Sequence, residues 1–191
     1  MLASPEPGAR SSPVEAFDAR VEELSSPLRG NPIADRLFYT ASAFGDFGLI
    51  WLALGLVRVL RGRPGDTRAG LRAIVATGIE SVVVNAGLKS LFQRRRPRPV
   101  DAHPLPFRQP LTSSFPSGHA TAAFCAAVLL ADGEKHKAPY YVVASVVALS
   151  RIHTKIHHGS DVAGGAVIGL VLGSVARRIA PLHRAARRNG R

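Results

Sequence analysis

The chain is poor in cysteine, in acidic residues and in aromatic residues. Of its 191 residues, one is cysteine, 13 are Asp or Glu, and 6% are Phe, Trp or Tyr. The single Cys125 excludes an internal disulfide, and its place in an apolar run indicates a small buried side chain. Because 25 residues are Lys or Arg, the shortage of acids leaves a formal net charge of +12. This charge indicates an anionic partner: a nucleic acid, an anionic membrane surface or an anionic substrate.

The first residues of the chain also lack the apolar stretch of a cleavable signal peptide. We therefore expect residues 1–11 to be a disordered leader, and delivery to a membrane to depend on internal segments. Residues 12–15, Ser-Pro-Val-Glu, have the form of a capping box with proline at the first helical position. Apolar residues then recur at helical spacing, at Val14, Phe17, Val21 and Leu24. This pattern predicts an amphipathic helix that lies on the membrane surface or packs against the domain.

Five apolar segments follow, at about 37–60, 71–92, 118–131, 139–152 and 162–179. A helix needs roughly 20 apolar residues to cross a bilayer, so the third and fourth segments are short. They can still cross if their polar ends belong to a site at the membrane surface. We predict an all-α, integral-membrane bundle of about five spans plus the N-terminal amphipathic helix. Residues 12–180 would form a single domain and 181–191 a basic tail; the alternative is a soluble bundle with buried apolar helices.

Two local patterns refine this prediction. The fifth segment carries Gly165, Gly169 and Gly173 at four-residue spacing, which predicts close contact with another helix. Residues 94–116 are rich in proline and basic residues, which forbids a continuous helix and predicts a loop.

Three polar stretches accompany the apolar segments. They are Lys89 with Arg96-Pro97, then Pro116-Ser117-Gly118-His119, then Ser150-Arg151 with His157 and Asp161. Together they resemble the signature of the type 2 phosphatidic acid phosphatase superfamily, which reads K-x6-R-P, P-S-G-H and S-R-x5-H-x3-D. The chain matches this signature without a departure, over about residues 85–165. The resemblance implies a helical membrane bundle that handles a phosphate group.

The third stretch supplies a candidate nucleophile. His157 and Asp161 are four residues apart, so on a helix their side chains would share a face. The carboxylate would fix the imidazole tautomer and leave the other ring nitrogen free to attack phosphorus. The resemblance implies that His157 forms a phosphohistidine and that Asp161 orients it. Taken alone, a histidine four residues before an aspartate is also common as a surface pair.

The second stretch supplies a candidate acid and part of a phosphate cradle. Ser117 is a good N-cap residue and Gly118 allows close backbone approach, so this helix start suits a phosphate. The resemblance implies that His119 protonates the departing oxygen and later activates water. The cations expected to surround the phosphate oxygens are Lys89, Arg96 and Arg151.

Two acids, Asp46 and Glu80, lie within apolar segments, where ionisable groups are costly and usually face the bundle interior. We expect them to pair with each other across helices; a contact with the substrate's head group is the alternative. Ser81, Asn85 and Lys89 follow at four-residue steps and predict a polar stripe that leads to the site. Arg98 extends the basic motif and is a candidate for a second phosphate or a head group.

The resemblance implies a membrane lipid phosphate phosphatase that hydrolyses a phosphomonoester or a diphosphate, with no metal and no cofactor. The chain's small size is similar to that of compact bacterial members, which favours a polyprenyl-linked phosphate over a glycerolipid. When the basic residues of the motifs are set aside, the face opposite the motifs, with the loops at 61–68 and 135–137 and the tail, is the richer in Lys and Arg. This distribution predicts a bacterial plasma-membrane protein whose active site faces outward, with membrane lipids as its neighbours.

Three alternatives stay open at this point. A vanadate-dependent haloperoxidase uses the same pocket, but such proteins resemble larger soluble chains. A non-catalytic binder of lipid head groups would not need the intact His119, His157 and Asp161. A nucleic-acid partner is not expected, because the basic residues are spread between helix ends and aromatic residues are few.

Overall fold

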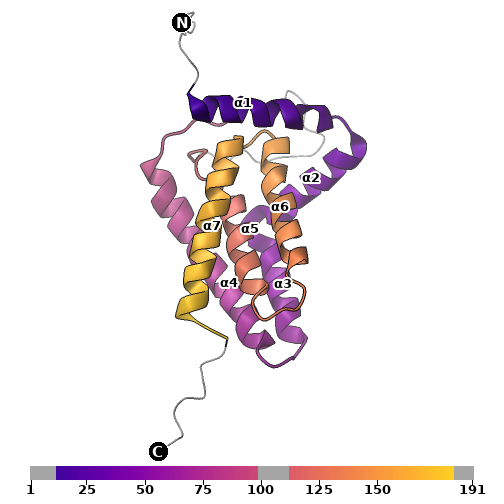
Figure 1. Ribbon diagram of the computed structural model, residues 1–191, viewed down its shortest axis with the longest axis vertical. Coiled ribbons are helices and arrows are strands. Elements are labelled where there is room, and N and C mark those ends of the chain that lie inside the picture. Colours follow the sequence, from indigo (N-terminus) through magenta and orange to yellow (C-terminus); the bar gives the residue numbers. More distant parts are fainter. Residues whose placement is uncertain (1–11, 99–111, 183–191) are drawn as a thin grey trace, which may run out of the picture.

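The computed structural model describes residues 12–98 and 112–182, and the described chain folds into helices without a strand. The helix α1 (Pro13–Ser25) lies across one end of a bundle (Figure 1). The bundle comprises α2 (Pro32–Gly45), α3 (Leu49–Leu60), α4 (Asp66–Val82), α5 (Gly118–Leu130), α6 (Ala138–His153) and α7 (Gly159–Ile179). The expected leader and nearly all of the expected tail lie outside the described residues, as does most of the proline-rich loop.

Three segments are long and apolar enough to cross a membrane: Pro32–Leu60, Asp66–Leu91 and Gly159–Ile179. The apolar α5 has 13 residues and α6 has 16, so both are as short as the sequence indicated. The predicted all-α membrane bundle is confirmed, whereas the number of crossings stays a prediction.

The capping box predicted at the start of α1 is present. The Ser12 hydroxyl accepts from the backbone N–H of Glu15 at 3.2 Å, and the Glu15 carboxylate accepts from the backbone N–H of Ser12 at 2.8 Å. The helix packs against α6 and α7 and buries none of its residues completely. Phe17 and Leu24 remain half-exposed or more on its flank. Of the two placements predicted for this helix, the structure has it packed on the bundle.

The first apolar segment is broken, although its composition predicted one continuous helix over 37–60. Residues Asp46–Gly48 form a 3₁₀ turn between α2 and α3, with φ of 54° at Phe47 and 69° at Gly48. Glycine adopts such angles without steric cost, whereas phenylalanine does not. The two halves have different neighbours, since α2 packs on α6 and α3 packs on α4. The break therefore redirects the chain and places Asp46 beside α5.

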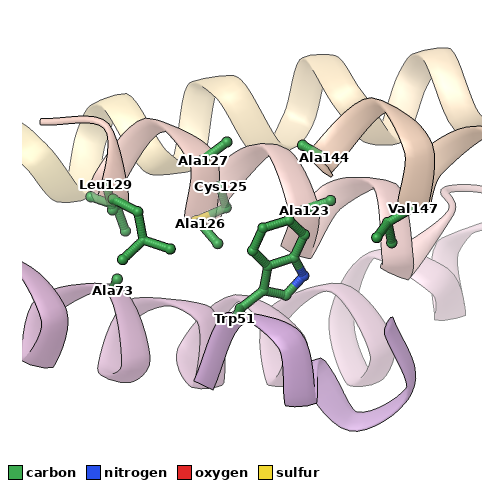
Figure 2. Close-up of a cluster of buried hydrophobic side chains, with 10 residues drawn as sticks. Trp51, Ala73, Ala123, Cys125, Ala126, Ala127, Leu129, Ala144 and Val147 are labelled. Atoms are coloured by element: carbon green, nitrogen blue, oxygen red, sulfur yellow. The ribbon is translucent and has the colours of Figure 1, made fainter. Parts of the chain in front are cut away.

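The centre of the bundle is α5, whose small side chains let its neighbours approach closely. Figure 2 shows Trp51 of α3 pointing into the cluster formed by the alanines of α5. A Cβ added to Gly165, Gly169 or Gly173 would lie 2.6, 2.3 or 2.8 Å from a backbone carbonyl oxygen of the Ser117–Cys125 stretch. The close helix contact predicted from these glycines is confirmed, and its partner is α5.

The end of the bundle opposite α1 is held by buried ion pairs. The Arg58 Nε lies 3.1 Å from Asp66 Oδ1, and the Arg58 Nη2 donates to the Asp132 carbonyl at 2.7 Å. The Arg72 Nη2 lies 2.8 Å from the Asp132 carboxylate. Here the α3–α4 and α5–α6 loops meet (Figure 1), so α3, α4 and α5 are joined by charge-assisted hydrogen bonds.

Candidate active site

A cavity of about 660 Å³ lies between the α2–α3 break, α4 and α5. Its lining includes five of the eight predicted site residues: Lys89, Gly118, His119, Arg151 and His157. Residues up to 68 positions apart in the chain therefore line the same cavity. The other three lie outside this lining. Arg96 and Asp161 contact His157, and Ser117 caps the helix that begins with Gly118 and His119.

His157 lies in the turn between α6 and α7, and this corrects the helical pairing expected from the sequence. The α7 helix begins only at Gly159, so His157 and Asp161 are not on one helix face. The His157 backbone N–H donates to the Arg151 carbonyl at 3.1 Å, which fixes the turn. His157 is 3% exposed. The ring and the carboxylate still meet, because the turn folds back over the first turn of α7.

Asp161 is fully buried and is held by several donors. Its Oδ2 accepts from the Ser114 hydroxyl at 2.5 Å and from the His158 backbone N–H at 2.9 Å. Its Oδ1 accepts from Arg94 Nη1 at 2.6 Å. The His157 Nδ1 lies 3.6 Å from Oδ2, longer than a hydrogen bond. Catalytic hydrogen bonds are often long in ligand-free sites and shorten when the substrate binds.

The other ring nitrogen of His157 faces a cation. The Arg96 Nη1 lies 3.3 Å from Nε2, and because arginine can only donate, Nε2 is the accepting, unprotonated nitrogen. Burial lowers the pKa of His157 to about 3, with the nearby charges of Arg96 and Arg151 acting in the same direction. Near neutral pH the ring therefore keeps a lone pair on Nε2, as a nucleophile requires.

His119 is the second residue of α5, and its ring reaches the α2–α3 break. Ser117 caps the helix, since its hydroxyl accepts from the Ala120 backbone N–H at 3.5 Å. The His119 Nε2 lies 3.0 Å from Asp46 Oδ1. The expected pairing of Asp46 with Glu80 is therefore wrong, because the break turns Asp46 toward α5.

The cationic residues surround the same end of the cavity. Lys89 is 8% exposed, and an added Cβ on Gly118 would lie 3.5 Å from its Nζ. The same Cβ would lie 3.3 Å from Asn85 Oδ1, which is a tighter contact, so a side chain at position 118 would press on Asn85. Arg151 is 2% exposed and donates to the Ser42 hydroxyl. The Arg96 guanidinium donates to the backbone carbonyls of Thr112, Ser113 and Ile156.

Two residues of the site, Arg94 and Ser114, gave no sequence signal. Arg94 lies inside the unspecified gap of the first motif, in a stretch that predicted only a loop. Ser114 precedes the second motif by a few positions.

Glu80 is 3% exposed, and its carboxylate has no hydrogen-bond partner among the described residues. It lines a separate apolar groove of about 790 Å³ between α4 and α7.

A family model described as the PAP2 superfamily matches residues 69–184, which is more than half of the chain. The chain belongs to the PAP2 superfamily. It is 34% identical over 140 residues to decaprenylphosphoryl-5-phosphoribose phosphatase of Mycobacterium tuberculosis, covering 70% of this chain and 73% of that relative. It is 29% identical over 159 residues to undecaprenyl-diphosphatase BcrC of Bacillus subtilis, covering 81% and 79%.

Two solved structures of PAP2 proteins share the fold. A transmembrane PAP2-type phosphatidylglycerolphosphate phosphatase from Bacillus subtilis superposes with a TM-score of 0.70, at 24% identity over 93% of this chain and 91% of that one. LpxE from Aquifex aeolicus gives a TM-score of 0.64, at 27% identity over 82% and 93%. The predictions of the family, of a membrane-embedded helical bundle and of the lipid phosphatase class are confirmed.

Proposed function

We propose that this PAP2 protein hydrolyses a polyprenyl-linked phosphate through a phosphohistidine on His157. One observation carries the proposal: the rings of His157 and His119 line one cavity together with Lys89 and Arg151. A phosphoryl group in that cavity has a nucleophile, an acid and two cations around it. These are the groups that phosphoryl transfer requires.

In the first step, the His157 Nε2 attacks phosphorus as the bond from phosphorus to the lipid oxygen breaks. The bonding electron pair leaves on that oxygen, which takes a proton from His119. Asp161 stabilises the Nδ1–H of the ring as positive charge develops. The charge on the equatorial oxygens is balanced by Lys89, Arg96 and Arg151, each worth about 10²–10³ in rate.

In the second step, water attacks the phosphohistidine and gives its proton to His119. The phosphorus–nitrogen bond breaks, phosphate leaves, and His157 returns to its neutral form. The backbone at Ser117 and Gly118, where α5 begins, would receive phosphate oxygens. Since side chains supply the positive charge around the phosphate, we expect phosphate release to continue in EDTA.

The cavity also supports a lipid substrate. Beyond its polar end, its walls carry Leu52 and Ile74, which face each other from α3 and α4. An isoprenoid chain would contact these side chains while its phosphate reaches the histidines. The names of the relatives in Mycobacterium tuberculosis and Bacillus subtilis support polyprenyl carriers, both as a phosphomonoester and as a diphosphate.

We also propose a bacterial plasma-membrane location with the site facing outward. The α3–α4 and α5–α6 loops lie at the end opposite α1 and carry Arg61, Arg63, Lys135 and Lys137, and positively charged loops favour the cytoplasm (Figure 1).

The nucleophile is tested by His157→Asn in the full chain, purified in detergent. We expect phosphate release from polyprenyl phosphates to fall by at least about 10³-fold, since the residues of such a site act as a unit. A substrate labelled on phosphorus should leave acid-labile, base-stable label on the wild-type protein and none on the variant. The control is His136→Asn, whose ring is exposed. Unchanged turnover by His157→Asn would refute the mechanism.

The substrate is tested with a panel of polyprenyl monophosphates and diphosphates, phosphatidic acid and phosphatidylglycerol phosphate. We expect the highest kcat/KM for a polyprenyl compound. A glycerolipid preference would keep the phosphatase class and overturn the polyprenyl assignment.

A further inference from the structure

We infer that α1 positions the carboxylate of Asp161 through one residue, because its Asp18 holds Arg94 against that carboxylate. Arg94 and Asp18 would be positioning residues that act on His157 through Asp161. The inference rests on the roles proposed above for His157 and Asp161.

Arg94 is placed between two carboxylates from distant parts of the chain. Its Nη1 donates to Asp161 Oδ1 at 2.6 Å, and its Nη2 donates to Asp18 Oδ2. The side chains of Asp18, Arg94 and Asp161 are 10%, 27% and 0% exposed. At this degree of burial, charge-assisted hydrogen bonds are short and directional, so the guanidinium links α1 to the acid beneath the histidine.

Asp18 also holds the helix on which Asp161 lies. Its Oδ1 accepts from the Ser160 backbone N–H at 2.8 Å, and its Oδ2 accepts from the Ser160 hydroxyl at 3.0 Å. A carboxylate at this place stabilises the first turn of α7, where free N–H groups and the positive end of the helix dipole lie. The Asp18 side chain therefore holds both the first turn of α7, which carries Asp161, and the guanidinium of Arg94.

The orientation of Asp161 determines how the His157 ring is held. The Oδ2 already accepts from Ser114 and from the backbone of His158, while Arg94 is the donor recorded on Oδ1. Without Arg94 the carboxylate loses its hydrogen bond on Oδ1, which removes one of the restraints on its rotation about χ2. Rotation would move Oδ2 relative to His157 Nδ1, and misplacement by about 1 Å can cost roughly 10² in rate.

Docking of α1 does not depend on Asp18 alone, and this makes the inference testable. Glu22 lies 2.7 Å from both Arg29 and Lys155, and Val21 packs on Gly159. Replacing Glu22 weakens the attachment of α1 without touching Arg94. Replacing Asp18 removes the contact with Arg94 and the cap on α7.

The experiment compares Asp18→Asn, Arg94→Ala, their double variant and Glu22→Gln, as full chains in detergent with a polyprenyl phosphate. We expect Asp18→Asn to lower kcat about tenfold and Arg94→Ala by roughly 10²-fold, with KM changed less than about twofold. In the Arg94→Ala background, Asp18→Asn should have little further effect on kcat. Arg94→Lys should recover part of the activity, and Glu22→Gln should lower Tm with kcat near the wild-type value.

Three results would overturn the inference. Equal losses of kcat in Glu22→Gln and Asp18→Asn, or fully additive losses in the double variant, would make Asp18 only an anchor for α1. Wild-type kcat in Asp18→Asn and Arg94→Ala, beside an inactive His157→Asn, would reject the inference and keep the proposed function. An active His157→Asn would reject the proposed function itself. If Arg94→Ala fails to fold, Asp18→Asn and Arg94→Lys decide the question.

Discussion

His157 is a histidine that the fold keeps neutral. It lies in a turn outside the membrane-spanning segments, and burial lowers its pKa to about 3 from an ordinary 6.5. Between these values the unfolded chain binds a proton that the folded site excludes. Stability contributed by this residue is therefore present above about pH 6.5 and is lost as pH falls toward 3.

The resulting prediction concerns thermal stability. We expect the Tm of the protein in detergent to fall between pH 7.5 and pH 5, and His157→Asn to make that fall smaller. The variant has no imidazole at position 157 to bind a proton on unfolding, so this contribution to the pH dependence of its stability is lost. Thermal unfolding of the two proteins at both pH values measures the difference, and an equal fall in both would contradict the assigned burial.

Gly45 provides a second prediction at this scale, because it packs against the ring of His119. A Cβ at position 45 would lie 2.7 Å from His119 Cδ2 and 3.0 Å from Val147 Cγ1. Gly45→Ala should therefore displace the ring, lowering kcat by about 10²-fold and stability by roughly 1–3 kcal/mol.

Gly78→Ala is the matched control for this substitution. Gly78 lines the same cavity, and a Cβ there would meet no atom within 4 Å. This variant should keep its kcat and gain about 0.5–1 kcal/mol, because alanine is the better helix residue. Equal activity in both variants would show that His119 tolerates a shift of its ring.

The sequence singled out residues that the structure brings into one cavity, but it did not predict their contacts. Lys89, His119 and His157 line that cavity, and each could be singled out because a motif is defined by spacing along the chain. The pairs Asp46–His119 and Arg94–Asp161 were not found, because each joins segments more than 60 residues apart. Such contacts depend on how helices pack, and hydrophobic spacing carries no information about them.

For the helices, the sequence likewise predicted positions better than breaks and ends. Apolar composition predicted where α5, α6 and α7 lie to within a few residues, because burial in a membrane requires long apolar runs. It missed the break at Asp46–Gly48, since a turn of one aspartate, one phenylalanine and one glycine interrupts the apolar run at a single charged position. It also placed His157 on a helix, whereas the glycine at 159 marks the true start of α7.

The contact between α5 and α7 gives a prediction at the scale of elements. A Cβ on Gly169 would lie 2.3 Å from the Thr121 carbonyl oxygen, and this backbone atom cannot yield. Gly169→Ala should push the two helices apart and cost about 1–3 kcal/mol, or a Tm lower by a few degrees. Activity should fall as well, because these helices carry His119 and Asp161.

Ala163→Leu, at an exposed position of the same helix, is the control. It adds more volume than Gly169→Ala but meets no neighbouring helix, so its Tm should stay near the wild-type value. A larger loss in Ala163→Leu than in Gly169→Ala would mean that α7 contacts another partner in the membrane.

For the whole molecule, the proposed orientation can be measured with added cysteines. The native Cys125 is 1% exposed, so the wild-type protein should not react with a membrane-impermeant maleimide. In intact bacteria, Arg20→Cys on α1 should react and Lys135→Cys in the α5–α6 loop should react only after the cells are opened. The reverse pattern would place the active site on the cytoplasmic side.

The two ends of the bundle are held together in different ways. At the end opposite α1, Arg58 and Arg61 share Asp66 and Glu134, which joins α3 to α4 and to the α5–α6 loop. At the other end, the cavity separates α3 and α4 from α5. We therefore expect the helices to separate more easily beside the cavity than at the end opposite α1, where charge-assisted hydrogen bonds join them. Such a separation would admit a lipid from the side and leave the ion pairs of Asp66 and Glu134 intact.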